Sequence, residues 1–503
     1  MSQPTYQSLG DYLNGEFVKC KKADGEIVNY SPADLKELVF SSTYCYDSVD
    51  KAMESAKKSF TEWAKTPLET RIEFLNKLKK AYLDNTDRIA ESISRETGKP
   101  RWEAVTEAKA LAAKIDVTIQ HSLKLVEDVV VENALPHVSG VIRYKPRGVM
   151  SVIGPFNFPA HLPNGHIVPA LLTGNTVVFK PSEKTPMVGQ IMAEMINAAG
   201  FPKGVFNLVQ GDGETGKRLA EHEWTDGVLF TGSYDVGLRI KQATLHHYWK
   251  LLALEMGGKN TSIVWKDAKL KKAVYECLVG SYLTSGQRCS CTSKIVLHSS
   301  IKDQFIDNFY QAAKKLKIGY WNEDPFMGPL ISESSVEKYL RFQEIAKRED
   351  AECLMRGKVL ELDREGHYVT PSINLVKEFN PKSVYQNSEI FGPNVGIFVV
   401  DDYEEAIEIV NSAGFGLVAS LFSDDRSLYE KALLDARVGL LNWNRTTNGA
   451  SSKLPFGGMG KSGNDRPSAH FAVNYCTVPV ASLEDLTEFD AGSVMPGIKF
   501  EMK

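Results

Sequence analysis

Gly227-Val228-Leu229-Phe230-Thr231-Gly232-Ser233 decides the fold class, because a continuous apolar run ends abruptly in a glycine and hydroxyl residues. A short run that is apolar on both faces predicts a strand buried on both sides. Similar runs occur upstream at 149–153, 176–179 and 205–209, and helical patterns separate them. Strands that alternate with helices predict a doubly wound α/β domain, which binds a ligand at the carboxyl ends of its parallel strands.

A second alternation of strands and helices follows from about residue 260 to residue 440, with apolar runs at 294–297 and 395–400. It predicts a second α/β domain. Upstream of both, from about residue 47 to residue 125, apolar residues recur at helical spacing within a charged sequence. This pattern predicts a series of amphipathic helices.

Two β-rich stretches, at 129–131 and 140–146, lie on either side of a break that contains Pro, Ser and Gly. They predict a protruding two-stranded arm. An isolated hairpin is only marginally stable in water, and unpaired strand edges are a liability. We therefore expect the arm to pair with the late β-rich stretch 474–480, from the same chain or another subunit, and we expect a homo-oligomer.

These patterns divide the chain into five predicted parts. The candidate cofactor domain takes residues 1–125 and 148–258, the second α/β domain 259–440, the oligomerisation arm 126–147 and 468–485, a loop and return segment 441–467, and a C-terminal extension 486–503.

The composition limits the location and the partners. A chain of 503 residues is too long for one compact core, so we expect two or three domains. The net charge is -4 and the sequence has no dense basic run, so nothing indicates nucleic-acid binding. Seven scattered cysteines without metal-ligand pairing are typical of a reducing compartment. With no signal pattern and no long apolar run, we expect a cytoplasmic protein that does not enter membranes.

Two segments carry reactive groups. Leu254-Glu255-Met256-Gly257-Gly258-Lys259 embeds a carboxylate among apolar residues and glycines, and Gly286-Gln287-Arg288-Cys289-Ser290-Cys291 presents a cysteine beside an arginine. A thiolate can attack a carbonyl carbon, and a separate carboxylate can later activate water to hydrolyse the resulting thioester. Either residue alone is more often a packing or surface residue.

A third segment, Gly154-Pro155-Phe156-Asn157-Phe158-Pro159, holds an amide suited to stabilise an oxyanion. In this order the three segments resemble the aldehyde dehydrogenase superfamily. Two further stretches, His161–Ala170 and Gly463–Ala469, resemble the branch that oxidises N-succinylglutamate 5-semialdehyde in arginine catabolism. The resemblance covers roughly the first 485 residues.

The resemblance implies an NAD-dependent, hydrolytic aldehyde dehydrogenase that is at least a dimer. Cys289 would form a thiohemiacetal and then a thioester, Asn157 and the Cys289 N–H would stabilise the oxyanion, and Glu255 would activate water. The corresponding family segments also imply the cofactor residues. Those beside the phosphates would be Gly232, Ser233, Tyr234, Asp235, Val236 and Gly237, although Tyr234 is larger than the residue expected there.

The resemblance also assigns the ribose and nicotinamide contacts. Lys180 and Glu183 would hold the adenosine ribose, where a carboxylate repels a 2′-phosphate and favours NAD over NADP. Glu389 would contact the nicotinamide ribose, and Phe391 would steady the nicotinamide. Without the resemblance, these segments are compatible with ordinary turns and solvated loops.

A substrate with two carboxylates requires cations or backbone N–H groups at the entrance. Residues 442–450 resemble the family's substrate-anchoring loop and are called the substrate-loop segment; the candidates in it are Arg445, Gly449 and Ala450. The other candidates are Ser290, beside the nucleophile, and Arg466, in the stretch Gly463–Ala469. The two arginines could equally be structural salt-bridge partners.

Other interpretations remain open. A CoA-acylating enzyme has no need of the hydrolytic base Glu255, whereas a dehydrogenase of glutamate or succinate semialdehyde would use the same residues. An inactive binding protein on the same fold would not need the intact reactive set. A metal site at His161 and His166 is disfavoured, because no Cys or carboxylate cluster lies nearby in the sequence.

Overall fold

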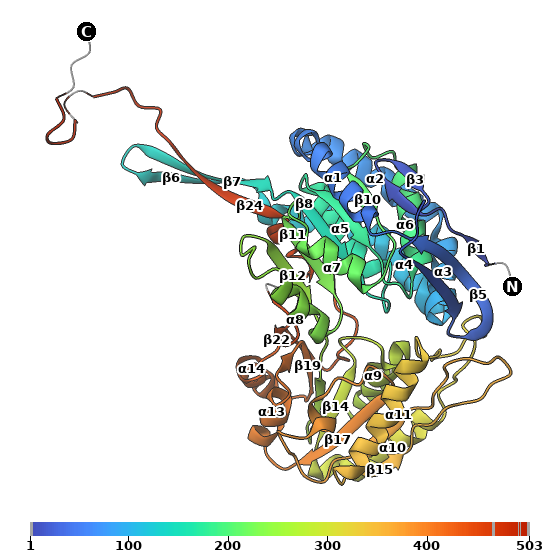
Figure 1. Cartoon of the computed structure of the whole chain (residues 1–503). Helices are drawn as coiled ribbons and strands as arrows, with labels where there is room; N and C mark the ends of the chain where they lie inside the picture. Colours follow the sequence, from blue (N-terminus) through green and yellow to red (C-terminus); the bar gives the residue numbers. More distant parts are fainter. Residues whose placement is uncertain (1–3, 465–467, 491, 493, 500–503) are drawn as a thin grey trace.

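The computed structural model describes residues 4–464, 468–490, 492 and 494–499, which form two α/β bodies and a projecting arm (Figure 1). The first body contains a sheet of order β12-β11-β8-β9-β10-β2-β3. Its parallel strands are β8 (Val149–Ile153), β9 (Thr176–Lys180), β10 (Phe206–Leu208), β11 (Gly227–Thr231) and β12 (Leu251–Glu255). Every residue of β9, β10 and β11 is buried, which accounts for their apolar runs.

The edge of this sheet and a smaller sheet come from the N-terminal segment. Antiparallel β2 (Asp11–Leu13) and β3 (Glu16–Val18) extend the first sheet beyond β10. A separate three-stranded sheet contains β1 (Tyr6–Gln7), β4 (Gly25–Ser31) and β5 (Asp34–Tyr44).

The predicted amphipathic helices lie between the N-terminal strands and the arm. They are α1 (Asp47–Lys65), α2 (Leu68–Asp84), α3 (Thr86–Thr97) and α4 (Arg101–Val117), and α4 continues through a π turn (Thr118–Ser122) and a 3₁₀ turn (Leu123–Val126). The helices between the sheet strands are α5 (His161–Leu172), α6 (Pro186–Ala198), α7 (Gly213–Glu221) and α8 (Tyr234–Ala243). Helix α4 packs on α5, which brings its buried face close to the loop before α5.

The second body contains a sheet of order β15-β16-β17-β14-β13-β19-β20. Its strands are β13 (Asn260–Val264), β14 (Thr292–His298), β15 (Glu352–Met355), β16 (Ser372–Leu375), β17 (Asn394–Val400), β19 (Val418–Phe422) and β20 (Leu440–Trp443). Only β15 among them pairs antiparallel, with β16. The predicted α/β fold class is therefore confirmed, and the sheet continues to Trp443, past the expected boundary at residue 440.

Helices cover this second sheet. They are α9 (Leu270–Tyr282), α10 (Lys302–Lys314), α11 (Glu333–Arg348), α12 (Val384–Asn387), α13 (Tyr403–Asn411) and α14 (Arg426–Asp435), with 3₁₀ turns at Leu283–Gly286 and Ser299–Ile301. Two small ladders close the loops beyond the sheet. They pair β18 (Phe415–Gly416) with β22 (Met459–Gly460) and β21 (Pro455–Phe456) with β23 (Ser468–Ala469).

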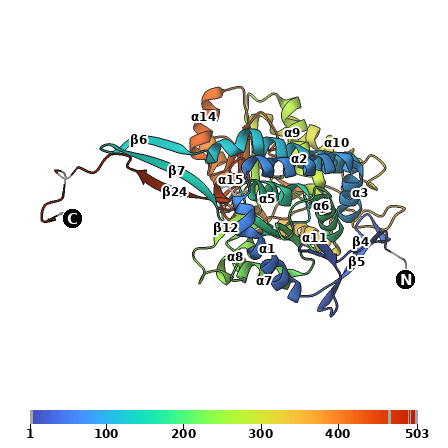
Figure 2. The same cartoon turned by 90° about the horizontal axis from the view of Figure 1, so that it is seen from above.

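The arm consists of β6 (Val129–Leu135), β7 (Val138–Pro146) and β24 (Thr477–Glu484). Both views show it projecting from the first body (Figures 1 and 2). The predicted partner strand comes from the same chain, but its predicted start at Asn474 was wrong. The short helix α15 (Ala472–Tyr475) occupies that position, because Ala472, Val473 and Tyr475 turn into the core beside α5.

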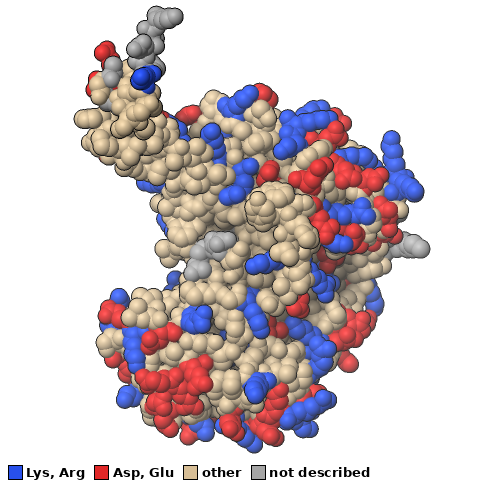
Figure 3. All heavy atoms as spheres, turned by 60° about the vertical axis from the view of Figure 1, so that its left-hand side comes forward, with Lys and Arg blue, Asp and Glu red and all other residues tan. Residues whose placement is uncertain are grey.

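The surface carries both signs of charge. On the face shown in Figure 3, basic and acidic side chains are interspersed, and the surface is indented where the two bodies meet. Among the described residues, no helix is both long and apolar enough to cross a membrane.

Candidate active site

A cavity of about 890 Å³ lies at the carboxyl ends of the first sheet's parallel strands and reaches the second body. Ligand pockets usually measure roughly 300–1,000 Å³, so this one can hold an extended ligand. Nine of the predicted site residues line it: Asn157, Lys180, Glu183, Gly232, Ser233, Val236, Cys289, Glu389 and Phe391.

The amino end of α8 forms one wall of the cavity. Ser233 caps the helix, because its Oγ accepts the Val236 N–H at 3.4 Å. The first N–H groups of a helix and its dipole favour an anion. This wall therefore suits the phosphates of a dinucleotide.

Lys180 is the last residue of β9, and Glu183 lies on the loop that follows it. The Lys180 ammonium is buried, donates to the Pro181 carbonyl at 2.9 Å and lies 3.6 Å from the Glu183 carboxylate. Burial lowers the pKa of Lys180, while the charge of Glu183 opposes that change. The pair presents one cation and one half-exposed carboxylate to the cavity, a combination suited to ribose hydroxyls.

Three of the predicted phosphate-loop residues lie outside the cavity lining. The Tyr234 ring packs edge-on against Phe415 at 6.5 Å between ring centres. A Cβ on Gly237 would lie 2.4 Å from Met256 Sδ, so this glycine allows α8 to approach the strand loop. The side chain of Asp235 is exposed in the first turn of α8.

Glu389 and Phe391 close the cavity from the second body. Glu389 Oε1 accepts the Gly258 N–H at 2.9 Å. Burial raises the pKa of Glu389, and this N–H together with Lys338 and Lys259 opposes the rise. Phe391 has a left-handed backbone with φ of 60°, and its ring meets Phe156 edge-on at 5.8 Å. Such a conformation in a bulky residue is uncommon and is concentrated at functional sites.

Cys289 lies on a loop that follows a sharp turn. Three successive residues, Thr284, Ser285 and Gly286, have positive φ, and a Cβ on Gly286 would lie 2.2 Å from the Gly392 carbonyl oxygen. Asn260 Nδ2 then donates to the Cys289 carbonyl at 2.7 Å. The turn and this bond fix the backbone of the nucleophile.

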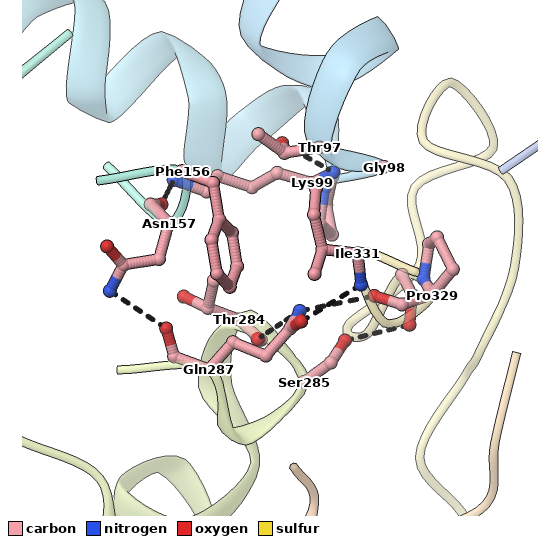
Figure 4. A pocket seen from close by; sticks show the side chains of 12 residues that line it. Thr97, Gly98, Lys99, Phe156, Asn157, Thr284, Ser285, Gln287, Pro329 and Ile331 are labelled. Carbon is pink, nitrogen blue, oxygen red and sulfur yellow. Dashed lines mark hydrogen bonds between the residues drawn. The ribbon is translucent and has the colours of Figure 1, made fainter. Parts of the chain in front are cut away.

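The Asn157 amide lies on the same side of the cavity as Cys289. Its Nδ2 donates to the carbonyl of Gln287 at 3.0 Å, two residues before the cysteine, and its Oδ1 accepts the Phe158 N–H at 3.1 Å. The amide is therefore tied directly to the nucleophile loop, as Figure 4 shows for Asn157 and Gln287.

Glu255 is the last residue of β12, and its side chain is fully buried. Gly257 and Gly258, which follow Met256, each lie against a different residue of the site. A Cβ on Gly257 would lie 2.1 Å from Glu389 Oε2, and one on Gly258 would lie 2.5 Å from the Cys289 carbonyl oxygen. The segment therefore passes between Glu389 and Cys289, and only glycines allow this path.

Burial raises the pKa of the Cys289 thiol well above its ordinary value. The charges of Glu255 and Glu389 raise it further, and Arg288 lowers it. Both carboxylates thus disfavour the thiolate electrostatically. The negative charge of the thiolate must therefore be compensated before it can form.

Comparison with known proteins decides the family. Residues 17–480 match the aldehyde dehydrogenase family. The chain belongs to this family. N-succinylglutamate 5-semialdehyde dehydrogenase from Serratia proteamaculans is 38% identical over 503 residues, which covers 99% of this chain and 100% of that protein. The enzyme of the same name from Paraburkholderia xenovorans is 40% identical over 90% of this chain and 92% of its own.

Solved aldehyde dehydrogenase structures share the whole fold. An NAD-dependent aldehyde dehydrogenase from Sinorhizobium meliloti has a TM-score of 0.92 at 27% identity and covers 97% of both chains. A Thermus 1-pyrroline-5-carboxylate dehydrogenase with bound NAD has a TM-score of 0.88 at 30% identity, covering 95% of this chain and 93% of that chain. This aldehyde dehydrogenase therefore uses a nicotinamide dinucleotide, and the cavity wall at α8 fits its phosphates.

The four predicted substrate residues that the structure of this dehydrogenase describes do not line the cofactor cavity. Ser290 is buried, and its Oγ donates to Asn448 Oδ1 at 2.8 Å, so it holds the substrate-loop segment. Arg445 is exposed, and its Nη2 donates to the Gly449 carbonyl at 3.4 Å. Gly449 and Ala450 are also exposed. Arg466 lies outside the described residues.

Of the two histidines near the site, His166 has a side-chain partner, and His161 is held through its backbone N–H. His166 Nδ1 pairs with the Tyr475 hydroxyl at 2.6 Å, and burial lowers the pKa of His166 to about 3. The backbone N–H of His161 donates to Glu107 Oε1 at 3.1 Å. In the described part of the chain, no group of three or more His, Cys, Asp or Glu residues could hold a metal ion.

Several residues around the site were not expected from the sequence. Arg239 of α8 and Ser335 and Lys338 of α11 line the cavity. Each belongs to an amphipathic helix whose charged residues look like an ordinary solvated face. Glu103 and Glu107 of α4 are buried behind the reactive loops, and their spacing among alanines was a signal, because it places two carboxylates on the apolar face.

Proposed function

We propose that this aldehyde dehydrogenase oxidises N-succinylglutamate 5-semialdehyde to N-succinylglutamate with NAD, through a covalent intermediate on Cys289. The observation that carries the reaction is that Cys289 and Asn157 line the same cavity as Lys180 and the amino end of α8. A nucleophile, an oxyanion donor and a cofactor-sized cavity are thereby adjacent. The names of the two curated relatives support the choice of substrate.

The first step is addition of the Cys289 thiolate to the aldehyde carbon. The carbonyl oxygen becomes the oxyanion of a thiohemiacetal, which accepts hydrogen bonds from the Asn157 amide and the Cys289 N–H. Because the thiol has a raised pKa, its proton must leave before the attack, and it passes to solvent water.

The second half releases the product. When bound, NAD supplies the hydride acceptor, and loss of the hydride from the thiohemiacetal carbon leaves a thioester on Cys289. Glu255 takes a proton from water, the hydroxide adds to the thioester carbon, and the carbon–sulfur bond breaks. The carboxylic acid product leaves, the thiolate is restored, and Glu255 returns its proton to solvent.

Glu183 supports NAD rather than NADP. Its carboxylate lines the cavity and lies beside Lys180, where the ribose hydroxyls would be held. A 2′-phosphate at that place would bring its negative charges against the carboxylate. Lys180 alone would not discriminate, because a cation accepts either cofactor.

The recognition of the dianionic substrate is assigned to Arg445 and Arg466. The exposed position of Arg445 beside Gly449 supports this role, because its guanidinium can give up the long hydrogen bond of 3.4 Å to the Gly449 carbonyl. A charge-assisted contact contributes about 1.5 to 3 kcal/mol, roughly ten- to a hundred-fold in kcat/KM. Arg445→Ala should therefore lose activity on the dianion and keep it on a small neutral aldehyde.

We also propose a cytoplasmic homo-oligomer, at least a dimer. All seven residues of β6 are exposed, so the outer edge of the arm offers an open strand for another copy. A monomer mass of 55.9 kDa in solution scattering at micromolar protein would contradict this part of the proposal.

Steady-state kinetics tests the proposed reaction. The substrates are N-succinylglutamate, glutamate and succinate semialdehydes, and NADH formation is followed with Cys289→Ala and with Cys353→Ala, an exposed cysteine of β15, as the matched control. The proposal expects the highest kcat/KM on the succinylated substrate and loss of turnover only in Cys289→Ala. A higher kcat/KM on another semialdehyde overturns the substrate, and turnover by Cys289→Ala overturns the mechanism.

A further inference from the structure

A buried ion pair lies directly behind the Asn157 loop. Lys99, two residues before α4, and Glu107, in its second turn, are 2.6 Å apart, with 1% and 0% of their side chains exposed. The Lys99 ammonium also donates to the Asn157 backbone carbonyl at 2.7 Å. Figure 4 shows Lys99 reaching from the start of the helix toward this backbone.

Glu107 holds the other end of the same loop. Its Oε1 accepts the backbone N–H groups of Ala160 and His161, both at 3.1 Å. The ion pair thus hydrogen-bonds to the Asn157 carbonyl on one side of Phe158 and to two backbone N–H groups on the other. Rotation of the segment that carries the Asn157 amide would break at least one of these bonds.

A second carboxylate of α4 holds the nucleophile loop. Glu103 Oε1 accepts from Arg288 Nη2 at 2.7 Å and also from the Thr284 hydroxyl. Arg288 Nε donates to Thr284 Oγ1 at 2.7 Å. These bonds fix the residue next to Cys289 and one of the residues with positive φ that shape its loop.

The Phe158 ring joins the two halves of the arrangement. Lys99 Nζ lies 3.9 Å from its centre, and the Arg288 guanidinium lies 4.8 Å from it. Cations near an aromatic ring are attracted by its electron-rich face. Since Glu103 and Glu107 are four residues apart, they lie on one face of α4. This face contacts both the nucleophile loop and the Asn157 loop.

Stability alone does not explain these groups. Apolar residues of similar volume often stabilise a protein as well as a buried ion pair does. Hydrogen bonds, however, add direction, and apart from the Lys99–Glu107 bond itself, those described above for these three side chains end on the backbone or the side chain of a reactive loop. The feature that demands explanation is therefore the precise attachment of α4 to both loops.

We propose that α4 sets the distance between nucleophile and oxyanion donor, with Lys99 and Glu107 as positioning residues for Asn157 and Glu103 as the positioning residue for Arg288. This inference rests on the roles proposed above for Cys289 and Asn157. A misplacement of about 1 Å in a reacting group can cost about a hundred-fold in rate. Loss of the ion pair should therefore lower kcat about 10- to 100-fold and leave the KM for NAD unchanged.

The first test uses a variant that leaves no unpaired charge. Lys99→Met with Glu107→Gln removes both charges together and keeps similar side-chain lengths. The matched control is Lys294→Met, because Lys294 is equally buried but donates to the Ile409 carbonyl at 2.6 Å and to Ser412 Oγ at 3.0 Å, both at the end of α13. Thermal unfolding reports folding, and hydrolysis of p-nitrophenyl acetate reports acyl transfer at Cys289 without any hydride step.

The double variant should lose dehydrogenase kcat and ester hydrolysis together, while the control keeps both and both proteins stay folded. Wild-type kcat in the folded double variant overturns the inference and leaves the proposed function standing if Cys289→Ala is inactive. Turnover by Cys289→Ala overturns both. Should the double variant fail to fold, the two single variants Glu107→Gln and Lys99→Arg replace it, and unchanged kcat in both overturns the inference.

The second test addresses the Glu103 half. Alkylation of Cys289 by iodoacetamide is followed against pH in Arg288→Met, Arg288→Lys and Glu103→Gln. The profile of Arg288→Met should move to higher pH, Arg288→Lys should restore part of the shift, and Glu103→Gln should lie between wild type and Arg288→Met. A purely structural role would leave all four profiles superimposed, and that result overturns this half of the proposal.

Discussion

Gly258→Ala should displace the backbone of Cys289 from its position in the site. Gly258 lies between Glu255 and β13, and a Cβ there would be 2.5 Å from the Cys289 carbonyl oxygen and 2.7 Å from Asn260 Oδ1. Its φ lies outside the left-handed region, so alanine fits the backbone itself and only the contact is strained.

The size of the effect follows from these distances. Ordinary contact begins at 3.4 Å, so the Cys289 carbonyl must retreat by almost an ångström. It cannot do so freely, because Asn260 Nδ2 holds the same carbonyl at 2.7 Å. A displacement of about 1 Å in a reacting group costs about a hundred-fold, so we expect kcat to fall by that factor.

The assay is NADH formation at saturating NAD and aldehyde, with thermal unfolding as the check on folding. Gly396→Ala in β17 is the matched control, since its nearest atoms lie at 3.5 Å, within ordinary contact. It should keep wild-type kcat. If folded Gly258→Ala turned over as fast as Gly396→Ala, the tight passage of this segment between Glu389 and Cys289 would have no bearing on the chemistry.

Three further predictions concern the cofactor and the cysteines. Glu183→Gln should raise the kcat/KM with NADP relative to NAD, since it removes the carboxylate beside Lys180; equal use of both cofactors by the unmodified protein would argue against this placement. Because burial, Glu255 and Glu389 raise the pKa of Cys289, alkylation of the protein alone should still accelerate with pH at pH 9, and a plateau near neutrality would contradict the assigned environment. Mild peroxide should yield no Cys289–Cys291 disulfide by mass spectrometry, because Cys291 Sγ turns to the Leu283 carbonyl at 3.7 Å; recovery of the linked peptide would refute this.

The sequence predicted the two sheets well because their strands are buried on both faces. Continuous apolar runs such as Val149–Ile153 and Val395–Val400 admit few other structures. The strands β3 and β4 were missed, because exposed residues alternate with less exposed ones and no continuous apolar run forms. The helical start of α15 was also missed, since Tyr475 and Cys476 suit a strand equally well.

Within the site, the sequence located groups that occur in short motifs. Cys289, Asn157 and Lys180 each lie in a short segment that resembles the family, and all three line the cavity. Contacts between distant segments could not be predicted, because neither partner is unusual by itself. Tyr234 packs on Phe415 across the two bodies, and Lys99 meets the Asn157 carbonyl 58 positions away.

The most direct measurement of the central claim is mass spectrometry of the acyl-enzyme. Glu255→Gln is mixed with NAD and N-succinylglutamate 5-semialdehyde, quenched in acid and digested. Without a base to activate water, the thioester should accumulate, and the N-succinylglutamyl group should be found on the peptide that contains Cys289. A modified peptide elsewhere in the chain, or NADH formed with no acyl group on Cys289, would contradict the covalent mechanism.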